Sequence, residues 1–171
     1  AVPKPPQHEP VILFLIDNSA SLPPLDPQEK RVEALEKMFA FIQGRPYLLI
    51  LFGGKDEVFV DDPNRYRNNG QWTDFYWAFV KAREVQHEYP DGTDFRVIMV
   101  TDGVFDPSPK DWADSQVPEG QELKDFVAER LLRLLEDLNA PLYVIMVGDL
   151  TAAVVDTGSG EQAPQIVLDM V

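Results

Sequence analysis

Four short runs of mostly apolar residues constrain the fold of this chain more than any other feature. They cover positions 11–16, 47–52, 95–100 and 142–147. A strand with one wet face alternates apolar and polar residues, whereas a strand covered on both faces reads as a continuous apolar run. Because segments with helical periodicity separate the runs, we expect a doubly wound α/β fold. Its sheet is mostly parallel and has helices on both faces.

Three stretches carry the helical spacing. The first follows Asp26, with Asp26 as the N-cap, Pro27 at the first helical position and Gly44 closing the helix after residue 42. The other two cover positions 72–88 and 123–138. Of the remaining segments, 57–60 is predicted as a short antiparallel strand, 104–120 as a long loop and 166–168 as a last edge strand.

The length of the chain fits one domain. A chain of 171 residues can bury roughly 70% of its unfolded surface, which allows a substantial core. Residues 1–9 are rich in proline and are typical of a linker, so we expect the domain to cover 10–171. The chain begins with Ala1 instead of Met and stops just after an apolar run. We therefore expect it to be excised from a larger protein.

Composition excludes several classes of function. The formal net charge of −14 argues against a nucleic-acid partner, because phosphate binding needs clustered Lys and Arg. No apolar run approaches the ~18 residues of a membrane span, so we expect no membrane insertion by this segment. Cysteine is absent, which excludes a thiolate metal site and a cysteine nucleophile. The compartment stays open, with an envelope or extracellular position slightly favoured.

A small group of oxygen-bearing side chains follows the first apolar run. Asp17 ends that run, and Ser19 and Ser21 come at alternate positions after it. A carboxylate and two hydroxyls in one short loop offer the hard oxygen ligands that Mg²⁺ prefers. Taken one at a time, Asp17 also fits a turn residue, and the two serines also fit ordinary loop hydroxyls.

Two further oxygen donors are expected at the same edge of the sheet. Asp102 comes just after the strand over 95–100, and carboxyl ends of parallel strands meet at one edge. Thr73, followed by Asp74, lies at the start of a predicted helix at that edge, although a threonine there is also a common N-cap. Thr93 is a rival, but the strand between it and Asp102 puts it roughly 20 Å away. We therefore prefer Thr73.

This pattern resembles the von Willebrand factor type A domain with its metal-ion-dependent adhesion site. The family motif D-x-S-x-S, then Thr, then Asp is matched by residues 17–21, Thr73 and Asp102. The resemblance implies a sheet of order 3-2-1-4-5-6 with one antiparallel edge strand. It also implies that Ser19, Ser21 and Thr73 bind the metal directly, while Asp17 and Asp102 act largely through water. One departure is Gly70-Gln71-Trp72, where the family usually has a small residue before the threonine.

The function that follows is a metal-dependent protein–protein binding module, of the kind used in cell adhesion. Mg²⁺, with Mn²⁺ or Ca²⁺ as possible substitutes, would recognise an Asp or Glu presented by a protein partner. The oligomeric state is open. Many bacterial members of the family are instead adaptors for ATP-driven chaperones or metal-insertion machines.

An enzymatic alternative is a phosphohydrolase of the haloacid dehalogenase type, which also keeps an Asp after its first strand. Such an enzyme needs a second Asp two residues later as the general acid, and Ser19 stands there. We therefore expect no catalysis.

Two loops around the metal, over 104–120 and over 65–72, are the candidate rims of a binding surface. The lone Trp112 either belongs to that surface or plugs its own loop.

Overall fold

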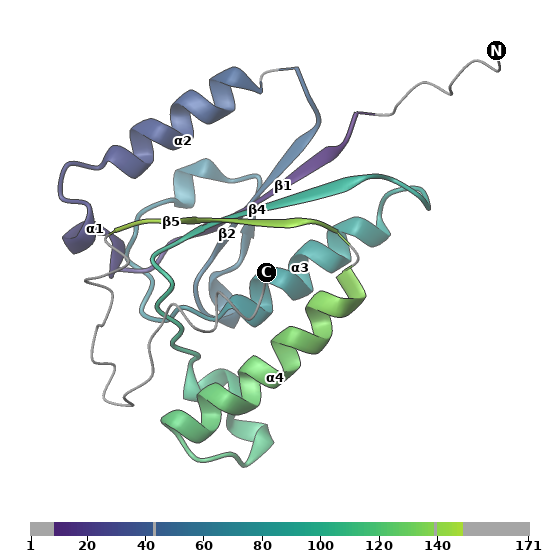
Figure 1. Cartoon of the computed structure of the whole chain (residues 1–171). Helices are drawn as coiled ribbons and strands as arrows, with labels where there is room; N and C mark the ends of the chain where they lie inside the picture. The colour runs from purple at the N-terminus through teal and green to yellow at the C-terminus, as the bar shows by residue number, and fades with distance from the viewer. Residues whose placement is uncertain (1–8, 43, 139, 149–171) are drawn as a thin grey trace.

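The described residues of the computed structural model, 9–42, 44–138 and 140–148, form a five-stranded sheet of order β3-β2-β1-β4-β5. Figure 1 shows this sheet with helices on both of its faces. The strands are β1 (Val11–Asp17), β2 (Tyr47–Phe52), β3 (Phe59–Val60), β4 (Phe95–Thr101) and β5 (Leu142–Met146). The doubly wound, mostly parallel fold with one antiparallel edge is confirmed for these strands. The sixth strand, predicted over 166–168, lies outside the described residues.

Strand β1 lies at the centre of the sheet, between β2 and β4, and is parallel to both. Asp17 lies opposite Phe52 of β2, and Ile16 lies opposite Val100 of β4. The residues that follow β1, β2 and β4 therefore leave the sheet at the same edge. The β2–β3 pair is antiparallel, as predicted, although β3 is only two residues long.

Two apolar clusters cover the two faces of the sheet. Helices α3 (Phe75–His87) and α4 (Gln121–Leu138) pack on the face that carries Leu13, Leu15 and Val97. Helix α2 (Lys30–Phe41) packs on the opposite face, where Leu35 contacts the cluster of Phe14, Ile16 and Leu51. This alternation of β1 side chains between two buried layers explains its continuous apolar run.

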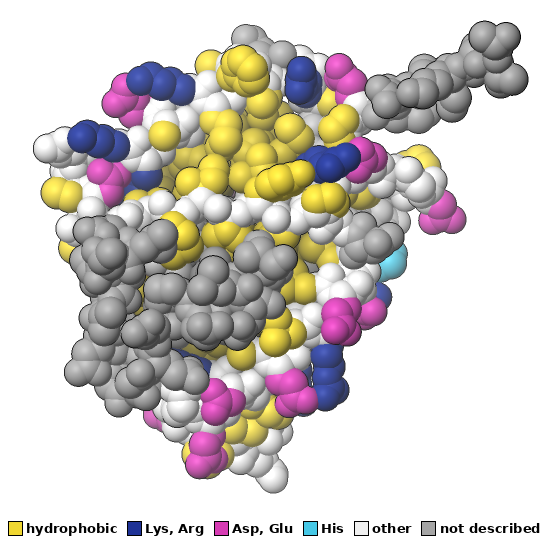
Figure 2. Space-filling model, in the orientation of Figure 1, with side chains coloured by type: hydrophobic (Ala, Val, Ile, Leu, Met, Phe, Trp, Pro, Cys, Tyr) yellow, Lys and Arg dark blue, Asp and Glu magenta, His cyan; other side chains and the backbone are white. Residues whose placement is uncertain are grey.

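The α2 side of the sheet is incompletely covered by the described helices. Tyr143 and Ile145 of β5 point to this side and are 53% and 46% exposed. Figure 2 shows apolar side chains gathered on this face. A groove there is lined by apolar side chains and by Asp26 and Arg31; its apolar members include Leu25, Met38, Val100 and Val147.

Helix starts differ from the sequence prediction. The first long helix, α2, begins at Lys30, and Glu29 stands before it with a left-handed φ of 54°. Asp26 is therefore not its N-cap, and Pro27 is not its first helical residue. A short helix, α1 (Leu22–Leu25), ends directly before Asp26. The Asp26 carboxylate instead accepts a 2.7 Å hydrogen bond from the Arg31 amide.

Helix α3 also begins later than predicted. It starts at Phe75, and the side chain of Asp74 caps it by accepting a hydrogen bond from the Tyr76 amide. Trp72 and Thr73 thus lie before the helix and not in it. The long loop over 104–120 contains a 3₁₀ helix at Pro109–Ser115. Among the described residues, no helix is long and apolar enough to span a bilayer.

Candidate metal centre

Asp17 is the innermost member of the candidate centre. It is the last residue of β1 and is completely buried. Its Oδ1 accepts a 2.9 Å hydrogen bond from the Ser19 amide, and its Oδ2 accepts a 2.7 Å hydrogen bond from the Thr101 hydroxyl. The first bond turns the chain directly after the strand. The carboxylate is therefore held by the loop that follows β1 and by the last residue of β4.

The two serines of the motif lie side by side. Ser19 Oγ and Ser21 Oγ are 2.8 Å apart and share a hydrogen bond. Ser19 is 3% exposed, whereas Ser21 is half-buried at the start of α1. Because each hydroxyl offers its oxygen in the same small volume, the pair suits an oxygen-seeking cation.

Asp102 follows β4 and is 1% exposed. Its Oδ1 accepts a 2.9 Å hydrogen bond from the Val104 amide. Its Oδ2 is buried and has no hydrogen bond of standard geometry, although the Ser21 hydroxyl lies close enough to lower the pKa of the acid. A buried carboxylate oxygen without a partner costs free energy unless a proton or a cation satisfies it.

The two carboxylates act on each other. Burial and, to a smaller degree, the nearby charge of Asp102 together raise the pKa of Asp17 to about 7, against the opposing effect of the hydrogen bonds from Thr101 and Ser19. Burial likewise raises the pKa of Asp102. Two buried acids that disfavour each other's ionisation form a place where a divalent cation lowers the free energy of the charged state. Asp17, Ser19, Ser21 and Asp102 thus gather at one edge of the sheet.

Thr73 lies at the same edge by its backbone contacts. Its amide and carbonyl exchange hydrogen bonds of 3.0 and 2.9 Å with Asp106, in the segment that follows β4. The next amide, that of Asp74, donates to the carbonyl of Gly53, directly after β2. Thr73 is buried and is not the helix N-cap, because Asp74 has that role. That its hydroxyl completes the ligand set stays a prediction.

The loop before Thr73 is joined to the serine loop through Gly70. The Gly70 amide donates to the carbonyl of Asn18, and the Ala20 amide donates to the carbonyl of Gly70, both at 3.0 Å. A Cβ at position 70 would lie 3.1 Å from both the Asn18 carbonyl oxygen and Glu57 Oε2. The close backbone approach therefore favours glycine here, and it brings the segment of Thr73 against the motif.

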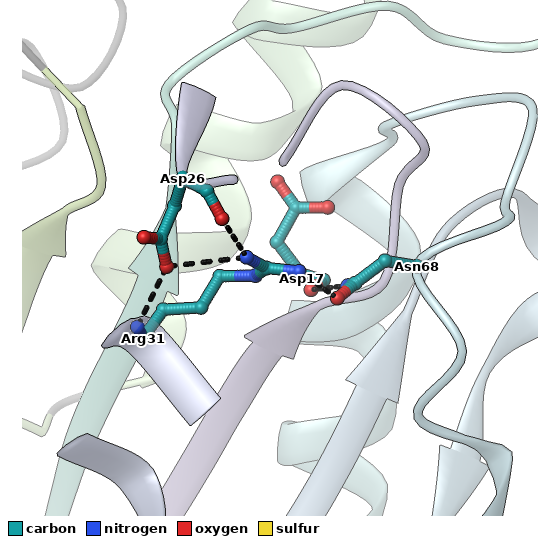
Figure 3. Close-up of polar contacts among 4 residues, drawn as sticks. All are labelled: Asp17, Asp26, Arg31 and Asn68. Atoms are coloured by element: carbon teal, nitrogen blue, oxygen red, sulfur yellow. Dashed lines mark hydrogen bonds and ion pairs between the residues drawn. The ribbon is translucent and has the colours of Figure 1, made fainter. Parts of the chain in front are cut away.

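Several residues of the centre were not predicted from the sequence. Thr101 bonds the Asp17 carboxylate, and Asn18 holds the loop over 65–68 with both ends of its amide. Each is adjacent to a predicted ligand, so the T-D-G and D-N-S patterns carried a signal for them. Asn68, which donates to the backbone carbonyl of Asp17, and Arg31, which donates to Asn68, carried none (Figure 3).

Trp112 packs inward and anchors its own loop, which is one of the two roles expected for it. Its ring contacts those of Tyr76, Trp77 and Phe126 at centroid distances of 5.0, 5.4 and 5.8 Å. Its Nε1 donates a 2.8 Å hydrogen bond to Asp74 Oδ2. Burial raises the pKa of Asp74 to about 7, and this bond opposes the shift. The loop that follows Asp102 is therefore fastened to the cap of α3.

The donor set decides which cation could fit. Within the described ranges, no group of three or more His, Cys, Asp or Glu side chains is placed to hold a metal ion. The centre instead combines two carboxylates with serine hydroxyls. Such a set suits a hard cation bound by oxygen and partly by water, and it does not suit a nitrogen- or sulfur-seeking ion.

Comparisons with known proteins give a distant likeness. No family model matches the chain, and no curated protein matches it. Among solved structures, the chain is similar to the conserved hypothetical protein BatB from Bacteroides thetaiotaomicron, with 13% sequence identity and a TM-score of 0.46. The match covers 94% of this chain and 98% of that one. This likeness is too distant to carry any function from that protein to this one.

Proposed function

We propose that this domain binds a protein partner through a divalent cation held by Asp17, Ser19, Ser21, Thr73 and Asp102. The cation is Mg²⁺, with Mn²⁺ or Ca²⁺ able to substitute for it. The partner presents an Asp or Glu carboxylate. The domain thus serves as a metal-dependent interaction module and not as an enzyme.

One observation carries the proposal: Asp102 Oδ2 is buried beside Asp17 and Ser21 without a hydrogen bond of standard geometry. A structural aspartate is normally satisfied by donors, as Asp74 is by Tyr76 and Trp112. An acceptor without a well-formed hydrogen bond, next to a second acid and two hydroxyls, supports a cation-binding site. The donors fit Mg²⁺, because all of them are oxygens.

The expected chemistry of the bound ion follows from the ligand set. Hydroxyl ligands are neutral, so the ion keeps much of its positive charge. A partner carboxylate can then replace a bound water and form a strong charge-assisted contact. Asp17 and Asp102 supply the balancing negative charge from the buried side of the site.

Catalysis is disfavoured by position 19. A hydrolase that uses Asp17 as the nucleophile would need an acid two residues later, and the Ser19 hydroxyl there is bonded to Ser21. An adaptor role in an ATP-driven assembly uses the same metal-dependent contact. It differs from adhesion in the partner and not in the site.

The decisive experiment measures ion binding and carboxylate binding separately. Electron paramagnetic resonance of Mn²⁺ reports its affinity, and Mg²⁺ should displace it. Water-proton relaxation in the Mn²⁺ complex should then decrease when N-acetyl-aspartate amide is added, because a carboxylate replaces coordinated water.

Asp102→Ala should abolish Mn²⁺ binding. A matched control is Asp94→Ala, because Asp94 precedes β4 at the opposite edge of the sheet and pairs with Arg96 on the surface. Equal Mn²⁺ binding by the two variants would disprove the proposed site. Binding of Mn²⁺ without any effect of the carboxylate probe would disprove the recognition mode alone.

A further inference from the structure

A buried arginine connects helix α2 to the loops of the candidate centre. Arg31 lies in the first turn of α2, and its side chain is 3% exposed. Its Nη1 donates to the backbone carbonyl of Asp26 at 3.0 Å and to Asp26 Oδ2 at 3.1 Å. Its Nη2 donates to Asn68 Oδ1 at 2.7 Å, as Figure 3 shows. The guanidinium thus bridges the segment before α2 and the loop that leads to Thr73.

Arg31 determines which way the Asn68 amide points. A guanidinium can only donate hydrogen bonds, so the amide oxygen of Asn68 has to face it. The amide nitrogen then faces the opposite way and donates to the backbone carbonyl of Asp17 at 3.4 Å. Arg31 therefore acts on the end of β1 through a side chain 37 positions away from it in sequence.

The loop over 65–68 is hydrogen-bonded to Asn18, which lies between two predicted ligands in sequence. Asn18, which separates Asp17 from Ser19, accepts hydrogen bonds at Oδ1 from the amides of Arg67 (2.9 Å) and Asn68 (2.8 Å). Its Nδ2 donates to the carbonyl of Arg65 at 3.0 Å. Asn68 has a φ of 49°, so this tight turn uses a backbone conformation that few side chains adopt freely. Arg31 holds the turn from its outer side.

We infer that Arg31 is a positioning residue of the candidate metal centre. By orienting Asn68, it fixes the Asp17–Ser21 turn against the loop over 65–70 and so sets the ligand geometry. The inference rests on the proposed function for its effect on the ion, but not for its effect on the loops. Asn68 contacts a predicted ligand residue directly, and Arg31 acts through it; the loss of a partner that orients a ligand typically changes metal affinity by about 10–100-fold.

A substitution of Arg31 can distinguish this positioning role from a merely structural one. Removing one partner of a buried ion pair can destabilise the fold, so the variants are compared at temperatures where each is fully folded. Arg31→Met keeps the apolar stem and removes every donor. If Arg31 only filled space, this change would leave the loops and the ion affinity as they are. If Arg31 positions Asn68, both will change at temperatures far below unfolding.

The first readout needs no metal. In EDTA, amide hydrogen exchange should be at least about tenfold faster in Arg31→Met within residues 17–21 and 65–70, because their shared hydrogen bonds open more often. Arg31→Lys is the second variant. It keeps the charge and the fold, but a single ammonium lacks the planar fork that reaches Asp26 and Asn68 together. We expect the same regions to exchange faster, to a smaller degree.

The second readout is Mn²⁺ affinity by electron paramagnetic resonance. We expect it to be about 10–100-fold weaker in Arg31→Met. The matched control is Arg83→Met, which removes an arginine that pairs with Asp137 on the surface between α3 and α4. That variant should match the wild type in both readouts.

Two outcomes would overturn the inference. One is wild-type exchange of residues 17–21 and 65–70 in both Arg31 variants, whatever the metal does. The other is wild-type Mn²⁺ affinity in both variants. A wild-type protein that binds no Mn²⁺ at all contradicts the proposed function instead, and the exchange measurement then decides the positioning role alone.

Discussion

The Thr101 hydroxyl donates a 2.7 Å hydrogen bond to Asp17 Oδ2, joining the ends of two neighbouring strands across 84 positions of sequence. The same hydroxyl accepts a 3.1 Å hydrogen bond from the Gly103 amide. Thr101 therefore fixes the Asp17 carboxylate and the turn of Asp102 together. A residue outside the predicted ligand set thus connects the two acids of the candidate centre.

Replacing Thr101 by valine tests this link. The change keeps the shape of the side chain but leaves Asp17 Oδ2 and the Gly103 amide without their partner. We expect a loss of about 1–3 kcal/mol in the free energy of unfolding and weaker Mn²⁺ binding, measured by urea denaturation and electron paramagnetic resonance. Thr93→Val is the control, because its hydroxyl bonds Pro90 in an exposed turn. Equal losses in both variants would contradict a special role for Thr101.

Stability without metal should decrease as the pH rises from about 4 to about 7. Burial raises the pKa of Asp17 and of Asp74 from 3.8 to about 7, so the folded state binds protons more tightly than the unfolded chain. That contribution is complete below the unfolded pKa and is lost as the pH passes through the folded pKa. Urea denaturation in EDTA at several pH values measures it. Asp17→Asn should flatten the profile, and an unchanged profile would contradict the assignment.

Metal affinity, in contrast to stability, should increase as the pH rises. The cation binds the ionised form of Asp17, whose pKa is raised to about 7, so a proton competes with it below that pH. We expect Mg²⁺ affinity to increase with pH up to about 7 and then to level off. Titration calorimetry in two buffers of different ionisation enthalpy would also detect the released proton. Identical heats in both buffers near pH 6 would argue that Asp17 is already ionised.

Saturating Mg²⁺ should stabilise the folded domain. At a hundredfold excess over the dissociation constant, the expected gain is about 2.7 kcal/mol, because the ion binds only the folded state. Asp102→Ala should show no such gain, while its fold in EDTA persists. Thermal unfolding with and without Mg²⁺ measures both effects. A gain that persists in Asp102→Ala would place the ion elsewhere on this acidic chain.

Trp112 should matter for stability more than for the ion. Trp112→Phe keeps much of the aromatic packing with Tyr76 and Trp77 but removes the hydrogen bond to Asp74. Leaving that buried carboxylate oxygen without its donor should cost about 1–3 kcal/mol. Mn²⁺ affinity should stay within about twofold of the wild type, which corresponds to less than about 0.5 kcal/mol. A large loss of Mn²⁺ affinity would show that Trp112 helps to place Thr73.

The sheet was predictable from the sequence because its central strands are buried on both faces. Their nearly continuous apolar runs leave little choice of structure, and the observed order of β3, β2, β1, β4 and β5 agrees with the order that the resemblance to the von Willebrand factor type A domain implies. The start of α2 was not predictable in the same way. Asp26 and Pro27 form a local pattern for a helix start, but the Asp26 carboxylate instead pairs with the side chain and amide of Arg31, five residues later and already inside α2.

The candidate site likewise contains residues that could be predicted from the sequence and residues that could not. Asp17, the two serines and Asp102 were predicted, because their places after buried strands follow from the fold. The Arg31–Asn68 contact joins two polar residues of ordinary spacing, and an arginine on a helix normally indicates a solvated face. Only the packing of α2 against the loop over 65–70 turns that face inward. A single sequence carries no sign of it.

The joining of Asp17 to Thr101 has a consequence for the order of events in synthesis. The earliest ligand emerges from the ribosome long before the strand that orders it, so the N-terminal half of the domain cannot capture the ion by itself. Occupancy of the centre would then report that β4 has docked beside β1. The cation would then bind only after the domain has folded and would not initiate its folding.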